Sequence, residues 1–241
     1  MRAETRHSLK EDRFSKATFE AAEKTVHWTQ EHQSKLIAAA VAVAVIAAIA
    51  VGGWYYINSQ DEKASLDFTS AVRTFDAQLR PPGSPAQPGV QSFESFALRA
   101  TAARKEFQGI VDKYPQTHTA KLARYFIGLA SVQLGDNAAA ESNLQAAANS
   151  SDADLSTLGK FALAALYNTE KKDSQAIDLY KQVIDKPSVE ITKVSAQLEL
   201  ASFYESRQKP DEAKRIYEQI QKENPSTEAA SLAQRHAAEL K

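Results

Sequence analysis

The stretch AIDLYKQVIDKP, residues 176–187, places an alanine, a tyrosine, a valine and a proline at successive intervals of four, three and four residues. The same order of alanine, bulky residue, aliphatic residue and proline returns in AKRIYEQIQKENP, residues 213–225. Residues three and four apart lie on one face of a helix, and a proline cannot continue a helix. Each stretch is therefore predicted to be a helix with one buried face.

Related sets begin at Ala103, Ala140, Ala176 and Ala213, which lie 37, 36 and 37 residues apart, and the set at Ala140 has no proline. A second helical pattern precedes each of the last three alanines. It consists of a large aliphatic residue, a small residue and a third position, and its three sets are Ile127, Gly128 and Ser131; Leu163, Ala164 and Tyr167; and Leu200, Ala201 and Tyr204. A period of this length is typical of tandem helical hairpins that bury their apolar faces against one another.

The segments around these repeats complete the predicted solenoid. Residues 61–80 carry a helical apolar stripe, which we interpret as the leading helix of the first hairpin. Residues 81–89, PPGSPAQPG, contain half of the prolines in the chain, which excludes a helix or a central strand and predicts an exposed loop. Residues 226–240 are predicted to form a helix that caps the last repeat.

A second decisive feature is the uncharged apolar run at residues 36–57. As a helix it would extend about 33 Å, enough to cross the hydrocarbon layer of a bilayer of about 30 Å. It is longer than the core of a signal peptide, so we interpret it as an uncleaved membrane anchor. The fold class expected is all-α: a single N-terminal transmembrane helix followed by an α-solenoid over residues 58–241.

The surroundings of the run indicate its orientation. Residues 1–35 carry mixed charge and are expected to form a short cytoplasmic tail, whereas Trp54, Tyr55 and Tyr56 form an aromatic belt at the far end of the run. The C-terminal domain is thus expected outside the cytoplasm. Small residues recur at every fourth position of the run and would allow another membrane helix to approach closely: Ala40, Ala44, Ala48 and Gly52.

Composition and motifs exclude several functions. The formal net charge is −1, which gives no electrostatic footprint for nucleic acid. The chain has no cysteine, no phosphate-binding loop and no nucleophile–base motif, and its histidines, including His27 and His32, lack the spacing of a zinc site. We expect neither an enzyme nor a bound cofactor or metal.

The repeat positions resemble the tetratricopeptide repeat, in which a small residue lies where two helices cross and a large residue fills the space beside it. The resemblance implies a groove for a protein segment, lined by the first helix of each repeat. Tyr125 and Phe161 are the expected anchors, and the alternative is that these residues pack against the neighbouring repeat. The candidate groove residues are Leu122, Tyr125, Leu129, Val132, Leu158, Phe161, Ala165, Asn168, Leu198, Ser202 and Glu205.

The whole arrangement is similar to the YfgM-type bacterial inner-membrane proteins, ancillary subunits of the SecYEG translocon. That resemblance implies a periplasmic scaffold beside the Sec translocon, with translocon subunits, periplasmic chaperones or client segments as partners in protein transport. Three alternatives stay open on the same repeats. They are a coordinator of cell division or envelope assembly, a regulatory subunit that docks a catalytic partner, and an organelle outer-membrane receptor that faces the cytosol.

Overall fold

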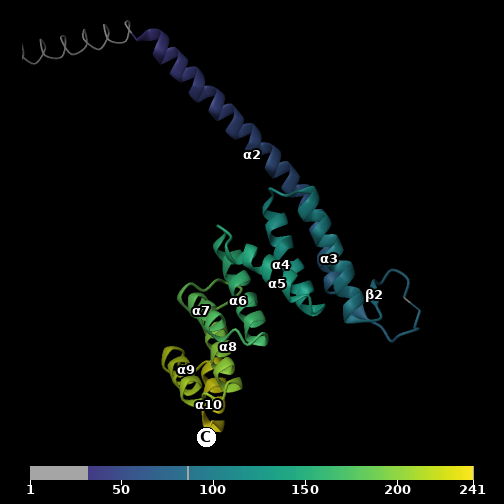
Figure 1. Ribbon diagram of the computed structural model, residues 1–241, viewed down its shortest axis with the longest axis vertical. Helices are drawn as coiled ribbons and strands as arrows, with labels where there is room; N and C mark the ends of the chain where they lie inside the picture. The colour runs from purple at the N-terminus through teal and green to yellow at the C-terminus, as the bar shows by residue number, and fades with distance from the viewer. Residues whose placement is uncertain (1–31, 86, 241) are drawn as a thin grey trace, which may run out of the picture. The chain divides into compact units, whose positions relative to one another are not determined.

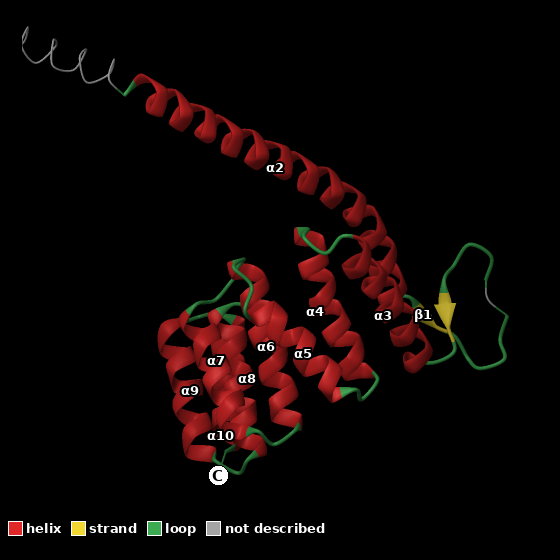
Figure 2. Cartoon of the chain, turned by 45° about the horizontal axis from the view of Figure 1, so that its top comes forward, coloured by secondary structure: helices red, strands yellow, loops and turns green. Residues whose placement is uncertain are grey.

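The computed structural model describes residues 32–85 and 87–240, and within this part nine helices and two very short strands are present. The expected all-α fold is confirmed (Figure 2). The predicted tail at residues 1–35, His27 included, lies almost entirely outside the described residues. The helices are α2 (Gln33–Phe75), α3 (Phe96–Lys113), α4 (His118–Gln133), α5 (Asn137–Ala148), α6 (Ala153–Thr169), α7 (Asp173–Asp185), α8 (Lys193–Ser206), α9 (Pro210–Glu223) and α10 (Glu228–Glu239).

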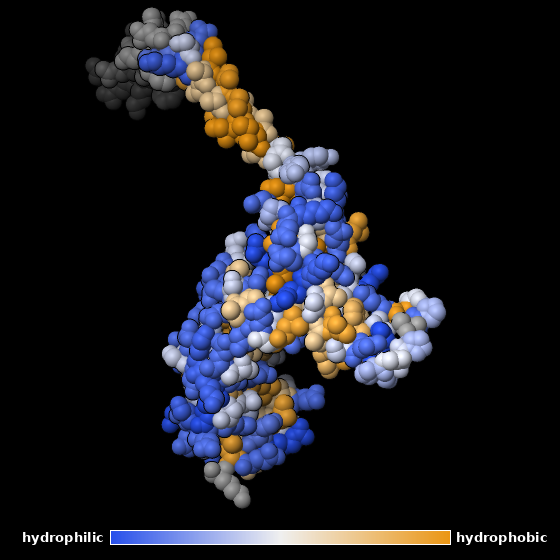
Figure 3. All heavy atoms as spheres, turned by 45° about the vertical axis from the view of Figure 1, so that its right-hand side comes forward, coloured by the Kyte–Doolittle hydropathy of each residue, from blue (hydrophilic) through white to orange (hydrophobic). Residues whose placement is uncertain are grey.

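The chain divides into two units, Met1–Tyr56 and Ile57–Lys241. The first unit contains the apolar part of α2, where none of the most apolar window is buried. By length and composition this helix can cross a membrane. Figure 3 shows its apolar side chains as a continuous exposed surface.

The second unit is a stack of antiparallel helices in which each helix from α3 to α10 packs against the next one in the sequence (Figure 1). Its core is formed by the predicted repeat positions. The four first-position alanines are each fully buried, and so are the bulky residues that follow them: Phe107, Leu144, Tyr180 and Tyr217. The predicted repeat register is confirmed.

The two helices of a repeat are joined by the same turn three times. In the first case the amide of Asp136 donates to the carbonyl of Ser131 at 2.9 Å, and Gly135 between them has a positive φ of 72°. Lys171 and Gln208 occupy the same place with φ of 58° and 57°. The same turn is thus formed once with glycine and twice with residues for which a positive φ is costly.

The first repeat takes its leading helix from the end of α2. Residues 57–75 pack on α3 and α4 through four phenylalanines, whose ring centroids lie 5.0 to 6.3 Å apart. These are Phe68, Phe75, Phe107 and Phe126. The predicted helix at residues 61–80 is confirmed, but it ends at Phe75 and not at Arg80.

It ends there because the chain enters a parallel bridge between β1 (Gln78–Leu79) and β2 (Ser92–Phe93). Arg80 holds this bridge: its guanidinium donates to the carbonyl of Ser92 and pairs with Glu94 at 3.2 Å. The proline-rich segment leaves the bridge as the expected loop, and its described residues, 81–85 and 87–89, are exposed except for the half-buried Ser84.

The helix crossings require small residues. A Cβ added at Gly128 on α4 would lie 2.7 Å from the side chain of Leu144. One added at Gly159 on α6 would lie 2.3 Å from the backbone nitrogen of Ala148. At the C-terminal end α10 buries Ala230 and Ala233 against α9, as a capping helix does.

Candidate binding surfaces

The predicted groove residues lie on the first helices of the later repeats, α4, α6 and α8. None of them is fully buried. Eight are half-buried, and the three exposed ones are Val132, Ala165 and Ser202. The structure therefore places all of them where a partner can reach at least part of the side chain.

The two expected anchors also contribute to the core. Tyr125 meets Phe126 edge-on at 5.4 Å between ring centroids, and Phe161 meets Tyr180 in the same way at 5.9 Å. Both rings pack against the buried cluster of the middle repeats. Burial raises the pKa of the Tyr125 hydroxyl above its ordinary value of 10.0. The anchors thus combine internal packing with partial exposure.

The polar end of the predicted groove is engaged within the chain. The Glu205 carboxylate accepts a hydrogen bond from Tyr217 at 2.9 Å and lies 3.8 Å from the ring of His236. The backbone carbonyl of Asn168 accepts a hydrogen bond from the Arg207 guanidinium at 2.8 Å. Leu198, in contrast, lines a hollow of about 520 Å³ between α8 and α10. The groove residues therefore do not share one environment.

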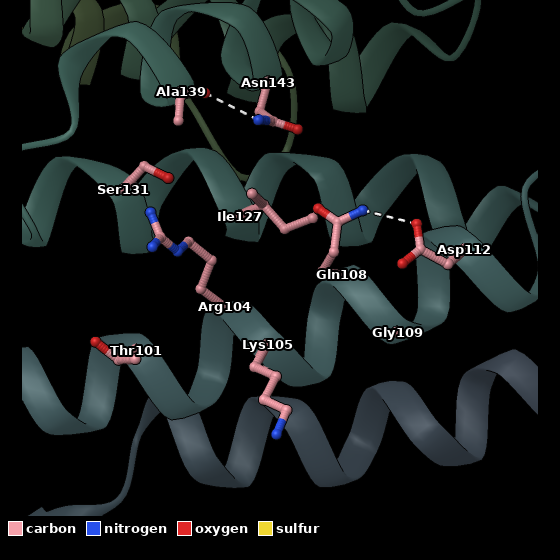
Figure 4. Close-up of a pocket in the computed structure, with 10 residues that line it drawn as sticks. All are labelled: Thr101, Arg104, Lys105, Gln108, Gly109, Asp112, Ile127, Ser131, Ala139 and Asn143. Atoms are coloured by element: carbon pink, nitrogen blue, oxygen red, sulfur yellow. Dashed lines mark hydrogen bonds between the residues drawn. The ribbon is translucent and has the colours of Figure 1, made fainter.

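A larger pocket, of about 560 Å³, lies between α3, α4 and α5. Figure 4 shows its lining: Arg104 and Lys105 extend from α3, and Ser131 projects from α4 on the same side as the Arg104 guanidinium. Arg104 pairs with Asp136 at 3.0 Å. The sequence identified Ser131 only as a repeat position, because periodicity reports burial and not the space left beside a small side chain.

A comparison with models of protein families identifies the family of this chain. The model of the tetratricopeptide repeat-like domain matches residues 26–219, which is most of the sequence. The chain belongs to the tetratricopeptide repeat-like domain family. No curated protein and no solved structure matches it in the corresponding searches.

The family assignment agrees with the geometry of the second unit. The match begins before the apolar helix and ends within α9, so it covers that helix and the hairpins up to that point. Domains of this kind are typically non-catalytic modules that bind other proteins. In the part of the chain that the structure describes, no three acidic or histidine side chains form a cluster able to hold a metal ion.

The predicted stripe for membrane-helix contacts lies in the first unit. Ala40, Ala44, Ala48 and Gly52 are all exposed on α2. A Cβ added at Gly52 would meet no atom within 4 Å. This stripe is accessible to another helix, and its use stays a prediction.

Proposed function

We propose that this tetratricopeptide protein is a membrane-anchored scaffold for protein–protein interactions. The observation that carries the proposal is the pairing of an apolar helix, exposed along its length, with a repeat domain whose first helices keep half-exposed apolar side chains. An exposed apolar helix of this length is stable only in an apolar surrounding such as a bilayer. A repeat domain joined to such a helix would act on proteins at the membrane.

We further propose that residues 36–57 span the bacterial inner membrane, with the N-terminus in the cytoplasm and the repeat domain in the periplasm. Trp54, Tyr55 and Tyr56 support this placement, because aromatic side chains at one end of an apolar helix favour the membrane–water interface. Asp61 follows in the next turn and accepts a hydrogen bond from the amide of Thr119 at 2.9 Å, so it belongs to the repeat domain.

As partners we propose subunits of the Sec translocon, periplasmic chaperones or client segments, on the strength of the likeness to YfgM-type proteins. The stripe from Ala40 to Gly52 would contact a translocon helix, and the half-exposed aromatic residues of α4 and α6 would contact the soluble partner. A coordinator of cell division or envelope assembly would use the same surfaces on other proteins. A regulatory subunit would use them on an enzyme.

Affinity capture of the full chain from detergent-solubilised membranes tests the partner. Under the main proposal, translocon subunits or periplasmic chaperones are recovered. The double variant Tyr125→Ala, Phe161→Ala should weaken the capture of soluble partners more than it lowers stability, because both rings pack partly on the core and are partly exposed. Phe96→Ala is the matched control, since Phe96 is an aromatic residue 62% exposed on α3, away from the predicted groove.

Recovery of division or outer-membrane assembly proteins without translocon subunits would replace the main proposal by its alternative. A collapse of stability without a selective loss of partners would assign Tyr125 and Phe161 to the core alone. The orientation is tested by reporters fused after Lys241, one active only outside the cytoplasm and one only inside. Activity of the inside reporter would contradict a periplasmic domain.

A further inference from the structure

The pocket between α3, α4 and α5 lies at a junction that the repeat pattern forms three times. Each junction consists of the second helix of one repeat and both helices of the next. The second junction is formed by α5, α6 and α7, and the third by α7, α8 and α9. Equivalent positions can therefore be compared within one chain.

One position that differs between the junctions is the third position of the first helix. Tyr167 holds it at the second junction and Tyr204 at the third, whereas the first junction has Ser131. The hollow at the third junction, where Tyr204 forms part of the wall, is about 280 Å³, half of the 560 Å³ at the first. A side chain without a ring thus leaves the first junction open.

The second junction shows how a ring fills this place. Tyr167 is buried, its hydroxyl donates to the Glu141 carboxylate at 2.8 Å, and the Lys172 ammonium lies 4.9 Å from the ring centroid. Lys172 in turn pairs with Glu141 at 2.9 Å. The phenol therefore has a polar partner for its hydroxyl and a cation over its face.

The first junction has the same kinds of groups with the charges exchanged. Arg104 stands at the position of Glu141, and Asp136 stands at that of Lys172, so the ion pair is reversed. The Ser131 hydroxyl is fully buried and lines the pocket without a hydrogen-bond partner. A buried hydroxyl without a partner is costly, and a ligand that supplies one gains that interaction.

We propose that this pocket binds the tyrosine side chain of a partner protein, in the place that Tyr167 fills within the chain at the next junction. The phenol hydroxyl pairs with Ser131, the ring packs on Ile127, and the Arg104 guanidinium supplies the cation. The partner role rests on the proposed scaffold function. The pocket itself can be tested on the isolated protein.

The probe is 4-methylphenol, which is the tyrosine side chain alone, added to the full chain in detergent with isotope-labelled isoleucine methyl groups. We expect a saturable shift of the Ile127 methyl signal, while Ile220, buried in α9, stays unchanged. Acetate is the control for a site that simply binds anions through Arg104 and Lys105. No saturable shift at Ile127, or an equal shift with acetate, overturns the proposal.

Two variants close the pocket in different ways. Ser131→Tyr places the chain's own phenol there, and Thr101→Trp covers the mouth from an exposed position on α3, which keeps the test valid if the first variant does not fold. Both should abolish the Ile127 shift. Ser131→Ala leaves the pocket open and should weaken binding about fivefold, the effect of one lost hydrogen bond. Shifts that persist with the pocket closed contradict the assignment.

Affinity capture tests separately whether the pocket binds a partner protein. A closed-pocket variant should recover less of a partner that the unmodified chain recovers. Equal recovery refutes the partner role of the pocket and leaves the scaffold function standing. Failure of the unmodified chain to recover any protein refutes the scaffold function and the partner role together, while 4-methylphenol binding still decides whether the pocket is a phenol site.

Discussion

At the scale of single residues, two helical glycines have opposite surroundings. Gly159 on α6 lies against the backbone of α5, so a methyl group there would come within 2.3 Å of the Ala148 nitrogen. Gly109 on α3 faces open space. We expect Gly159→Ala to lower the free energy of unfolding by about 1–3 kcal/mol through overpacking, and Gly109→Ala to raise it by about 0.5–1 kcal/mol.

Thermal unfolding followed by circular dichroism measures both changes. The matched pair removes the general helix preference for alanine from the comparison, because both substitutions are the same and both lie inside helices. Equal midpoints for the two variants would show that α5 and α6 do not approach as closely as the structure has them.

Another residue-scale prediction concerns pH. The hydrogen bonds from Lys172 and then from Tyr167 lower the pKa of Glu141 below its ordinary value of 4.5. A carboxylate with a lowered folded-state pKa stabilises the fold fully above its unfolded-state pKa, and this contribution is lost as the pH falls through the folded-state pKa. Stability should therefore decline as the pH drops below about 4.5.

Glu141→Gln should make that decline shallower, because it removes the titrating group. Unfolding midpoints measured from neutral pH to about pH 3 give the comparison. Glu218→Gln, an exposed change of the same kind on α9, is the control. An identical decline in the Glu141→Gln chain would assign the acid sensitivity to other carboxyl groups.

At the scale of helices, the repeat register predicts where two helices meet most closely. Ala176 on α7 is fully buried beside Tyr180 and Leu163 in the middle cluster. Ala176→Leu should cost about 1–3 kcal/mol, because the closely packed helices cannot move apart without losing other contacts.

The matched control is Ala146→Leu, which adds the same atoms at an exposed position on α5. It should change stability by less than about 0.5 kcal/mol. Chemical unfolding of the two variants measures the difference. Equal stability would contradict the register derived from the spacing of the four alanines.

At the scale of the whole molecule, a stack of repeats is predicted to differ in local stability from one repeat to the next. Removal of residues 225–241 deletes α10 and exposes the apolar face of α9, including Tyr217 and Ile220. In a linear array each repeat contacts only its neighbours. Amide hydrogen exchange should therefore rise in α8 and α9 while α3 and α4 keep their protection.

Hydrogen exchange followed by mass spectrometry resolves these helices as separate peptides. A matched removal at the other end of the domain is unsuitable, because residues 57–75 continue directly into the apolar helix. A uniform rise in exchange from α3 to α9 would show that the repeat domain unfolds as one unit and would refute the linear picture.

The sequence alone determined the buried face of each repeat helix, the apolar run and the exposed proline-rich loop. Spacing and composition carry this information, because a helix repeats its faces every 3.6 residues and a proline ends it. The small residues at the crossings followed from the same spacing. Gly159 did not, because the first-helix pattern read from the sequence began four residues later, at Leu163.

Only the tertiary structure showed which residues pack against the buried face of each helix. It showed that the end of α2 completes the first hairpin through four phenylalanines, and that Tyr125 and Phe161 pack partly inside. It also showed that Ser131 lines a pocket, whereas Tyr167 at the equivalent position of the next repeat is buried. Periodicity gives the direction of a side chain, whereas the space beside it depends on residues from other helices, which lie tens of positions away in the chain.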